Sequence, residues 1–148
     1  MGMRIYTFFL ATLLLAFSLS ARDHTAMNGT WTLVPTDSDF SGQSVIQTGT
    51  VTINERQGDI TVSRNFAYEG AGETFFYKDM IDSENSATIH TGKDLKSKAK
   101  WDHDVLKVIT TQAGFVTTES YVLGPNGNLT ATVVKPGSKP ITLVFVRK

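Results

Sequence analysis

Cysteine is absent from the sequence of 148 residues. Its absence excludes disulfide bonds, thiolate metal sites, a cysteine nucleophile and a lipid anchor attached through cysteine. An excess of basic residues is absent too, because 14 basic residues balance 14 acidic ones. Proteins that bind nucleic acids or anionic membranes carry a marked basic excess, so neither is an expected partner.

Long apolar runs are missing except near the N-terminus, where one run spans residues 5–20. A short positively charged segment precedes it, and residues 18–20 supply the small side chains that a signal peptidase recognises. The run is shorter than the roughly 20 residues that a membrane-spanning helix needs. We therefore predict a secretory signal peptide over residues 1–20, with cleavage after Ala21 as the alternative boundary. We then expect an exported protein, periplasmic or secreted, without a stable membrane anchor after cleavage. An uncleaved membrane anchor is the alternative.

A helical period of 3.6 residues is also absent after residue 20. Short runs of alternating apolar and polar residues replace it, in a chain that holds twenty threonines. Because β-branched residues favour strands, this pattern predicts an all-β fold. Removal of residues 1–20 leaves 128 residues, enough for one domain with its own core. We predict a flexible N-terminal tail over 21–28 and a single domain over 29–148.

The domain is expected to contain about ten strands joined by turns of two to five residues. Such short turns require antiparallel neighbours, so the predicted topology is an up-and-down meander. A meander of about 8–10 strands without covering helices closes into a barrel, which removes its exposed edges. The predicted strands cover residues 29–34, 45–55, 60–68, 74–81, 87–91, 95–101, 105–112, 115–123, 129–135 and 141–147.

Two connections carry more specific signals. Asn126-Gly127 suits a type I′ hairpin turn, because both central positions of that turn need a positive φ. The loop over residues 36–42 is expected to hold a single helical turn around residues 37–40.

Several motifs resemble the lipocalin and fatty-acid-binding protein superfamily. Gly29-Thr30-Trp31 opens the first predicted strand, a meander follows, and Arg147 lies in the last strand. Residues 99–108 and 118–123 are similar to small exported bacterial lipocalin-like proteins, in which a Trp-Asp-Gly-Asp turn precedes a strand and a Thr-Glu-x-Trp/Tyr strand follows. The resemblance implies a lipocalin-like β-barrel.

Two features depart from that resemblance. His103 stands where glycine is usual in the turn, and residues 35–43 are too few for the two-helix lid of fatty-acid-binding proteins. In lipocalins the first-strand tryptophan lies across the closed end of the barrel under a basic residue from the end of the sheet. The resemblance therefore implies that Arg147 covers Trp31 and closes the barrel there.

Two charged residues occupy the apolar register of their strands. Arg64 alternates with Val62 and Phe66, and Glu119 precedes Tyr121 in the same register. A charge inside a barrel is costly unless it is paired or solvated. In one interpretation the two residues line a water-accessible cavity, where Arg64 holds an anionic head group. In the other, a bulge turns one or both outward, or they form a structural ion pair.

Aromatic residues near Arg64 also have two interpretations, as a cavity wall or as ordinary core. They are Phe66, Tyr68, Phe75, Phe76 and Tyr77. The candidate cavity residues are Arg64, Phe66, Tyr68, Phe76, Glu119 and Tyr121.

The sequence offers no convincing metal or catalytic site. No pair of histidines has ligand spacing, and Asp102-His103-Asp104 is interpreted as a hairpin turn in which His103 adopts a positive φ. No nucleophile elbow or phosphate-binding glycine loop is present. We therefore expect no metal, no cofactor and no enzymatic activity, and we rank an enzyme that uses Glu119 as acid or base last.

The favoured hypothesis is an exported, non-enzymatic binding protein that holds a small hydrophobic or amphiphilic ligand inside the barrel. The alternative is a filled barrel without a ligand that serves as an envelope or secreted interaction module. Interior volume separates the two, because a ligand barrel needs a continuous pocket of about 300 Å³ or more. A filled barrel would instead pack Phe66, Phe76, Trp101 and Tyr121 together.

Overall fold

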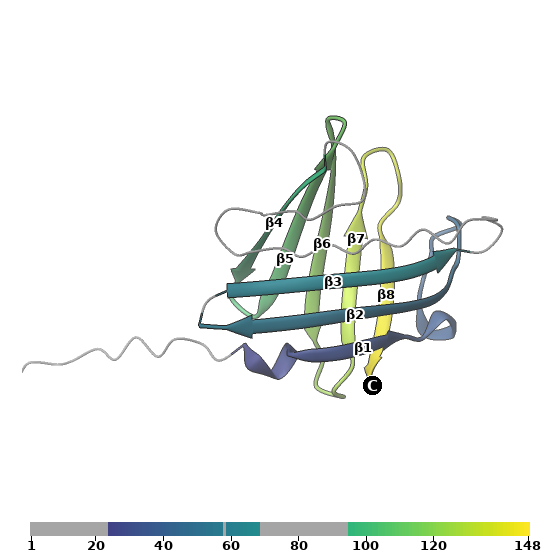
Figure 1. Cartoon of the computed structure of the whole chain (residues 1–148). Helices are drawn as coiled ribbons and strands as arrows, with labels where there is room; N and C mark the ends of the chain where they lie inside the picture. Colours follow the sequence, from purple (N-terminus) through teal and green to yellow (C-terminus); the bar gives the residue numbers. More distant parts are fainter. Residues whose placement is uncertain (1–23, 58, 69–94) are drawn as a thin grey trace, which may run out of the picture.

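A computed structural model describes residues 24–57, 59–68 and 95–148. These residues form one antiparallel sheet in the strand order β3-β2-β1-β8-β7-β6-β5-β4. Because β1 pairs with β8, the sheet curls into a nearly closed barrel (Figure 1). The strands span Gly29–Leu33 (β1), Ile46–Arg56 (β2), Asp59–Tyr68 (β3), Leu95–Asp102 (β4), Val105–Gln112 (β5), Phe115–Leu123 (β6), Leu129–Val134 (β7) and Ile141–Arg147 (β8).

The predicted all-β meander is confirmed. The eight observed strands agree with eight of the predicted ones to within one residue at each end. The other two predicted strands, 74–81 and 87–91, lie outside the described residues. Among the residues that are described, no helix is long and apolar enough to cross a membrane.

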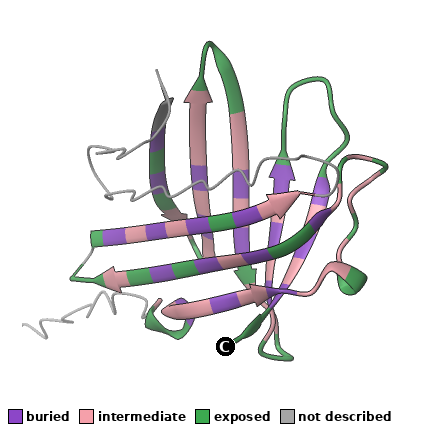
Figure 2. Cartoon of the chain, turned by 45° about the vertical axis from the view of Figure 1, so that its right-hand side comes forward, coloured by how far each residue is buried: buried purple, intermediate pink, exposed green. Residues whose placement is uncertain are grey.

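The strands form two layers that face each other. Figure 1 shows β1, β2 and β3 running across the other five strands. Buried bands alternate with intermediate and exposed bands along β2 and β3 (Figure 2), as expected for strands with one face inward. The inward side chains of both layers form the core, which includes Trp31, Val51, Val62, Leu106, Tyr121, Leu129 and Phe145.

The turn predicted at Asn126-Gly127 is wrong in type. Of the two residues only Gly127 has a positive φ, at 80°, whereas a type I′ turn requires both. The Gly124 N–H donates to Asn128 O at 2.8 Å, and the Gly127 N–H donates to Gly124 O at 3.0 Å. Pro125 explains the difference, because its fixed φ suits the second position of a type I turn and thereby lengthens the loop by one residue.

Two single-turn 3₁₀ helices also differ from the sequence expectation. The helical turn after β1 is η2, Pro35–Asp37, and it begins before the predicted residues 37–40. Proline at its first position favours this start, because its φ is already helical and its missing N–H needs no partner. The other, η1, spans Thr25–Met27 inside the segment expected to be a flexible tail.

Residues 24–28 are held against the barrel by contacts that the sequence pattern of this segment does not indicate. Met27 is only 5% exposed, and its carbonyl accepts a hydrogen bond of 2.9 Å from Trp31 Nε1. Asn28 Nδ2 donates to Glu55 O at 3.0 Å, and the Glu55 N–H donates to Asn28 Oδ1 at 2.7 Å. This reciprocal pair of hydrogen bonds fastens the segment to β2.

The end of the barrel near this segment is closed by Trp31 and Arg147, which are paired across β1 and β8. The Arg147 guanidinium carbon lies 4.3 Å from the centroid of the Trp31 ring. Its two terminal nitrogens donate to Asn28 O and Ala26 O, each at 2.7 Å. The guanidinium therefore stacks on the ring and satisfies two backbone carbonyls of the N-terminal segment.

Gly29 explains why glycine stands two residues before this tryptophan. Its φ is 131°, a conformation that side chains rarely adopt, and a Cβ there would lie 2.8 Å from Arg147 Nη1. Glycine thus supplies both the backbone conformation and the space for the guanidinium.

His24 joins distant parts of the sheet at the same end. Its ring stacks on Trp101 of β4 with centroids 3.7 Å apart, and its Nε2 donates to the carbonyl of His103 at 2.9 Å. Its Nδ1 lies 3.8 Å from Glu55 Oε2 on β2. Because β2 and β4 lie far apart in the strand order, His24 links the two layers where they are not neighbours.

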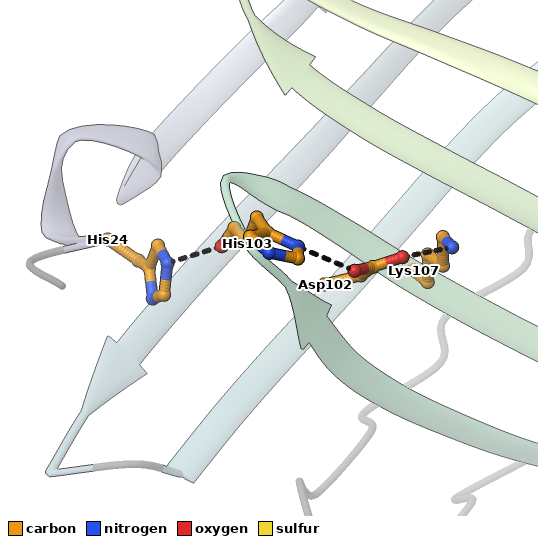
Figure 3. Close-up of polar contacts among 4 residues, drawn as sticks. All are labelled: His24, Asp102, His103 and Lys107. Atoms are coloured by element: carbon orange, nitrogen blue, oxygen red, sulfur yellow. Dashed lines mark hydrogen bonds and ion pairs between the residues drawn. The ribbon is translucent and has the colours of Figure 1, made fainter. Parts of the chain in front are cut away.

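The contacts of His24 continue along the turn between β4 and β5 (Figure 3). His103 adopts a φ of 56°, which confirms the prediction for this turn. Its Nδ1 lies 2.9 Å from Asp102 Oδ1, and Lys107 Nζ donates to Asp102 Oδ2 at 2.5 Å. The hydrogen bond from Lys107, with that from His103, lowers the pKa of Asp102 from 3.8 to about 2.

We predict that Gly29→Ala lowers the free energy of unfolding by about 2 to 4 kcal/mol, because it strains the backbone and displaces Arg147 from Trp31. Urea unfolding measures the change. In an Arg147→Ala background the same substitution should cost about 1 kcal/mol less, because the guanidinium is already gone. Equal costs in both backgrounds would show that Gly29 is not there to make room for Arg147.

We also predict a pH-dependent effect of Asp102→Asn. The lowered pKa means that the carboxylate stabilises the fold above pH 3.8 and loses this contribution as the pH falls through about 2. Wild type should therefore have the higher melting temperature at pH 7, and the two melting temperatures should converge near pH 2. In a Lys107→Met background the difference at pH 7 should shrink. A difference that does not change with pH would contradict the assignment.

Candidate functional site

The barrel encloses a cavity of about 310 Å³. Its described walls come from six strands and from the connections that follow β5 and β7. Side chains at the start of β2, the end of β3, the end of β5 and the start of β6 contribute, so the cavity lies at one end of the barrel. The described lining residues are Ile46, Arg64, Phe66, Tyr68, Thr110, Gln112, Ala113, Phe115, Thr117, Glu119, Val133, Lys135, Ile141 and Leu143.

Burial along the strands places the cavity opposite the end closed by Trp31. On β3, Val62 is fully buried and Phe66 lines the cavity. On β6, Tyr121 is almost fully buried, whereas Phe115 at the other end of the strand is 68% exposed. Among the described residues, the interior is therefore packed near Trp31 and hollow near the turn between β5 and β6.

Arg64 and Glu119 form an ion pair across the interior. They come from β3 and β6, which are not neighbours in the sheet, and Arg64 Nη1 donates a hydrogen bond to Glu119 Oε2. Both residues are buried, at 7% and 4% exposed. The Tyr121 hydroxyl donates to the other carboxylate oxygen, Oε1, at 3.1 Å.

The pair forms the floor of the cavity. Next to it in the inward register, Phe66 and Thr117 line the cavity on one side, whereas Val62 and Tyr121 are packed in the core on the other. Glu119 faces apolar strand neighbours, because its partners in register are Val108 and Val133. The ion pair is thus the boundary between the filled half of the barrel and the open half.

Electrostatics require that these two charges stay together. Removing an ionised group from water costs several kcal/mol per ion, and only a close, hydrogen-bonded partner offsets this cost. Arg64 and Glu119 have opposite unit charges, so the floor of the cavity is polar but has no net charge. The remaining charged residue among the described lining residues is Lys135, which is exposed at the rim.

Four of the six predicted cavity residues line the cavity, one does not, and one is not described. Arg64, Phe66, Tyr68 and Glu119 line the cavity. Tyr121 is not among the lining residues and supports Glu119 from the core side. Phe76 lies outside the described residues.

The structure also decides between the interpretations of the two charged residues, Arg64 and Glu119. A bulge that turns either residue outward is wrong, because the irregularity between β2 and β3 lies at Ile46 and Thr48 and the register of β6 is continuous. The cavity and the ion pair, which the sequence presents as alternatives, occur together. Arg64 and Glu119 line the cavity as a pair.

None of the other ten described lining residues was predicted. Thr110 and Thr117 face each other in register on β5 and β6. Val133 precedes the β7–β8 loop, and Ile141 and Leu143 follow it, all in the inward register. Alternation identifies these residues as inward, but it does not say which end of the barrel stays open.

The described residues contain no cluster of three or more histidine, aspartate or glutamate side chains that could hold a metal ion. In the turn between β4 and β5, Asp102 instead contacts the neighbouring His103 and Lys107.

Comparisons with known proteins identify the fold through structure alone. No protein-family model matches the sequence, and no curated protein sequence matches it significantly. Wild-type fluorescent protein UnaG matches with a TM-score of 0.61 and 18% identity, over 82% of this chain and 96% of its own. The chain has the barrel fold of the fatty-acid-binding proteins. The resemblance to the lipocalin and fatty-acid-binding protein superfamily is confirmed at the level of fold.

Two fatty-acid-binding proteins of flatworms illustrate the likeness. Fatty-acid-binding protein 1 of Echinococcus granulosus matches with a TM-score of 0.58 and 13% identity, over 82% of this chain and 97% of its own. The fatty acid binding protein of Schistosoma mansoni, in complex with arachidonic acid, matches with a TM-score of 0.60 and 13% identity, over 84% and 98%. At these identities the shared property is the fold.

Proposed function

We propose that this protein binds a small hydrophobic or amphiphilic ligand inside the barrel. The observation that carries the proposal is the cavity of about 310 Å³, which lies at the lower end of the range for small-molecule sites, about 300 to 1,000 Å³. Eight of its fourteen described lining residues are apolar or aromatic, and its floor is a buried polar pair. Such a combination binds an apolar body and orients it through one polar group.

The wall residues suit the apolar part of a ligand. Phe66, Val133, Ile141 and Leu143 are buried or nearly so and face the cavity from three strands. Each square ångström of apolar ligand surface that leaves water contributes about 25 cal/mol. The shared fold of fatty-acid-binding proteins, one of them with arachidonic acid bound, supports this proposal.

A filled barrel is less well supported. That hypothesis expects Phe66 and Tyr121 to pack together, but Phe66 faces the cavity and Tyr121 lies below the ion pair. We propose a non-enzymatic role as well, because Glu119 is held by both Arg64 and Tyr121 and is poorly placed to exchange a proton with a substrate.

We also propose that the protein is exported, on the basis of the predicted signal peptide. Expression in a secretion-competent bacterium should yield an extracytoplasmic protein that lacks residues 1–20, which intact mass measurement detects. Recovery of the full-length chain from the cytoplasm alone would contradict export without affecting the binding proposal.

Ligand binding is tested with two valines that are neighbours on β7 but face opposite sides. Val133 is 8% exposed and lines the cavity, whereas Val134 is 44% exposed on the outer surface. Val133→Trp should weaken binding of the uncharged fluorescent probe Nile red about tenfold, which is about 1.4 kcal/mol, because the indole fills part of the cavity. Val134→Trp should leave the affinity unchanged.

Fluorescence titration measures both affinities, and thermal unfolding checks that both variants fold. Native mass spectrometry of the purified wild type should in addition detect any ligand that co-purifies. Absence of saturable Nile red binding by the wild type would overturn the proposed function. Equal loss of affinity in both variants would place the probe outside the cavity.

A further inference from the structure

The charge balance of the cavity bears on what kind of head group it accepts. Arg64 alone on the floor would be a site for a carboxylate, because guanidinium groups bind carboxylates through two hydrogen bonds. In this barrel Glu119 already supplies that carboxylate from the opposite wall. The charge of the Arg64 guanidinium is therefore already neutralised before any ligand enters.

From this arrangement we propose that the Arg64–Glu119 pair makes the cavity selective for uncharged amphiphiles, with a hydroxyl, carbonyl or amide head group, and against carboxylates. The inference rests on the proposed function, and it names the class of ligand that the same cavity takes.

Repulsion disfavours a ligand carboxylate at the floor. To reach Arg64 it would have to share the guanidinium with Glu119, and two like charges at contact distance repel strongly where water is scarce. The Glu119 carboxylate is held in place on its other side, because the Tyr121 hydroxyl donates a hydrogen bond of 3.1 Å to its other oxygen. The ligand's own carboxylate would also lose its hydration on entry.

An uncharged head group meets none of these costs. The carboxylate of Glu119 accepts hydrogen bonds, and the Thr117 hydroxyl on the adjacent wall both donates and accepts. The Thr110 hydroxyl is instead hydrogen-bonded to Ser97 at 2.8 Å. Lys135 does not reverse this preference, because it is exposed at the rim, where water screens its charge. An alcohol or amide is thus able to hydrogen-bond to the floor while the ion pair stays intact.

The test compares dodecanol with dodecanoic acid, which have the same chain and differ in the charge of the head group. Each displaces Nile red from the wild type and from Glu119→Gln at neutral pH. Wild type should bind the alcohol at least about tenfold more tightly than the acid. Glu119→Gln removes the carboxylate that competes for Arg64, so the acid should gain about tenfold relative to the alcohol, and the acid should raise the melting temperature of this variant alone.

A second variant keeps the proposal testable if loss of the Glu119 carboxylate prevents Glu119→Gln from folding. Arg64→Gln with Glu119→Gln removes both charges and retains polar side chains of similar size. Because Arg64 does not anchor an acid in the wild type, the double variant should bind dodecanoic acid within about threefold of the wild type. A loss of tenfold or more would show that Arg64 does anchor the acid.

The outcomes separate the two proposals. Wild type that binds the acid as tightly as the alcohol, or Glu119→Gln that gains nothing for the acid, would overturn the selectivity and leave the binding function standing. Failure of the wild type to bind Nile red, the alcohol and the acid would overturn the proposed function itself. A preference of the wild type for the alcohol, together with a gain for the acid in Glu119→Gln, supports both.

Discussion

The interior of this barrel depends on one ion pair between strands that are not neighbours. Arg64 on β3 and Glu119 on β6 meet across the space that the sheet encloses, and neither charge is tolerable there without the other. The pair stands where apolar side chains would otherwise complete the core. Its position divides the barrel into a packed half and an open half, and the cavity exists because packing stops at this layer.

The packed half is organised around the closed end. Trp31 fills it, Arg147 stacks on the ring, and the backbone carbonyls of Ala26 and Asn28 accept hydrogen bonds from the same guanidinium. His24 ties that segment to β4 through its stack on Trp101. Trp31 is fully buried there, whereas the cavity lies at the opposite end of the barrel, so the proposed ligand would enter at that end.

The cavity favours the proposed binding function over a filled barrel, and under that proposal the floor of the cavity sets the chemistry of the ligand. An apolar wall favours any hydrophobic body of suitable size, so it contributes affinity and little selectivity. Selectivity comes from the polar groups, because a buried group that loses its partner costs more than an apolar contact gains. In an ion pair each charge is already neutralised by its partner, so a charged ligand group gains little there. This is the physical basis for expecting an uncharged ligand.

The sequence by itself determined the eight described strands and their antiparallel order, because alternation and turn residues are local properties of the chain. It placed Arg64 and Glu119 in the apolar register of their strands but left open whether a bulge turns them outward. It also indicated the contact of Trp31 with Arg147 through a family resemblance. Only the tertiary structure decided that the two charges meet, that Tyr121 lies below them, that residues 24–28 pack against the barrel, and which end stays open. These depend on how two layers cross, and register along one strand carries no information about the strand on the other side of the barrel.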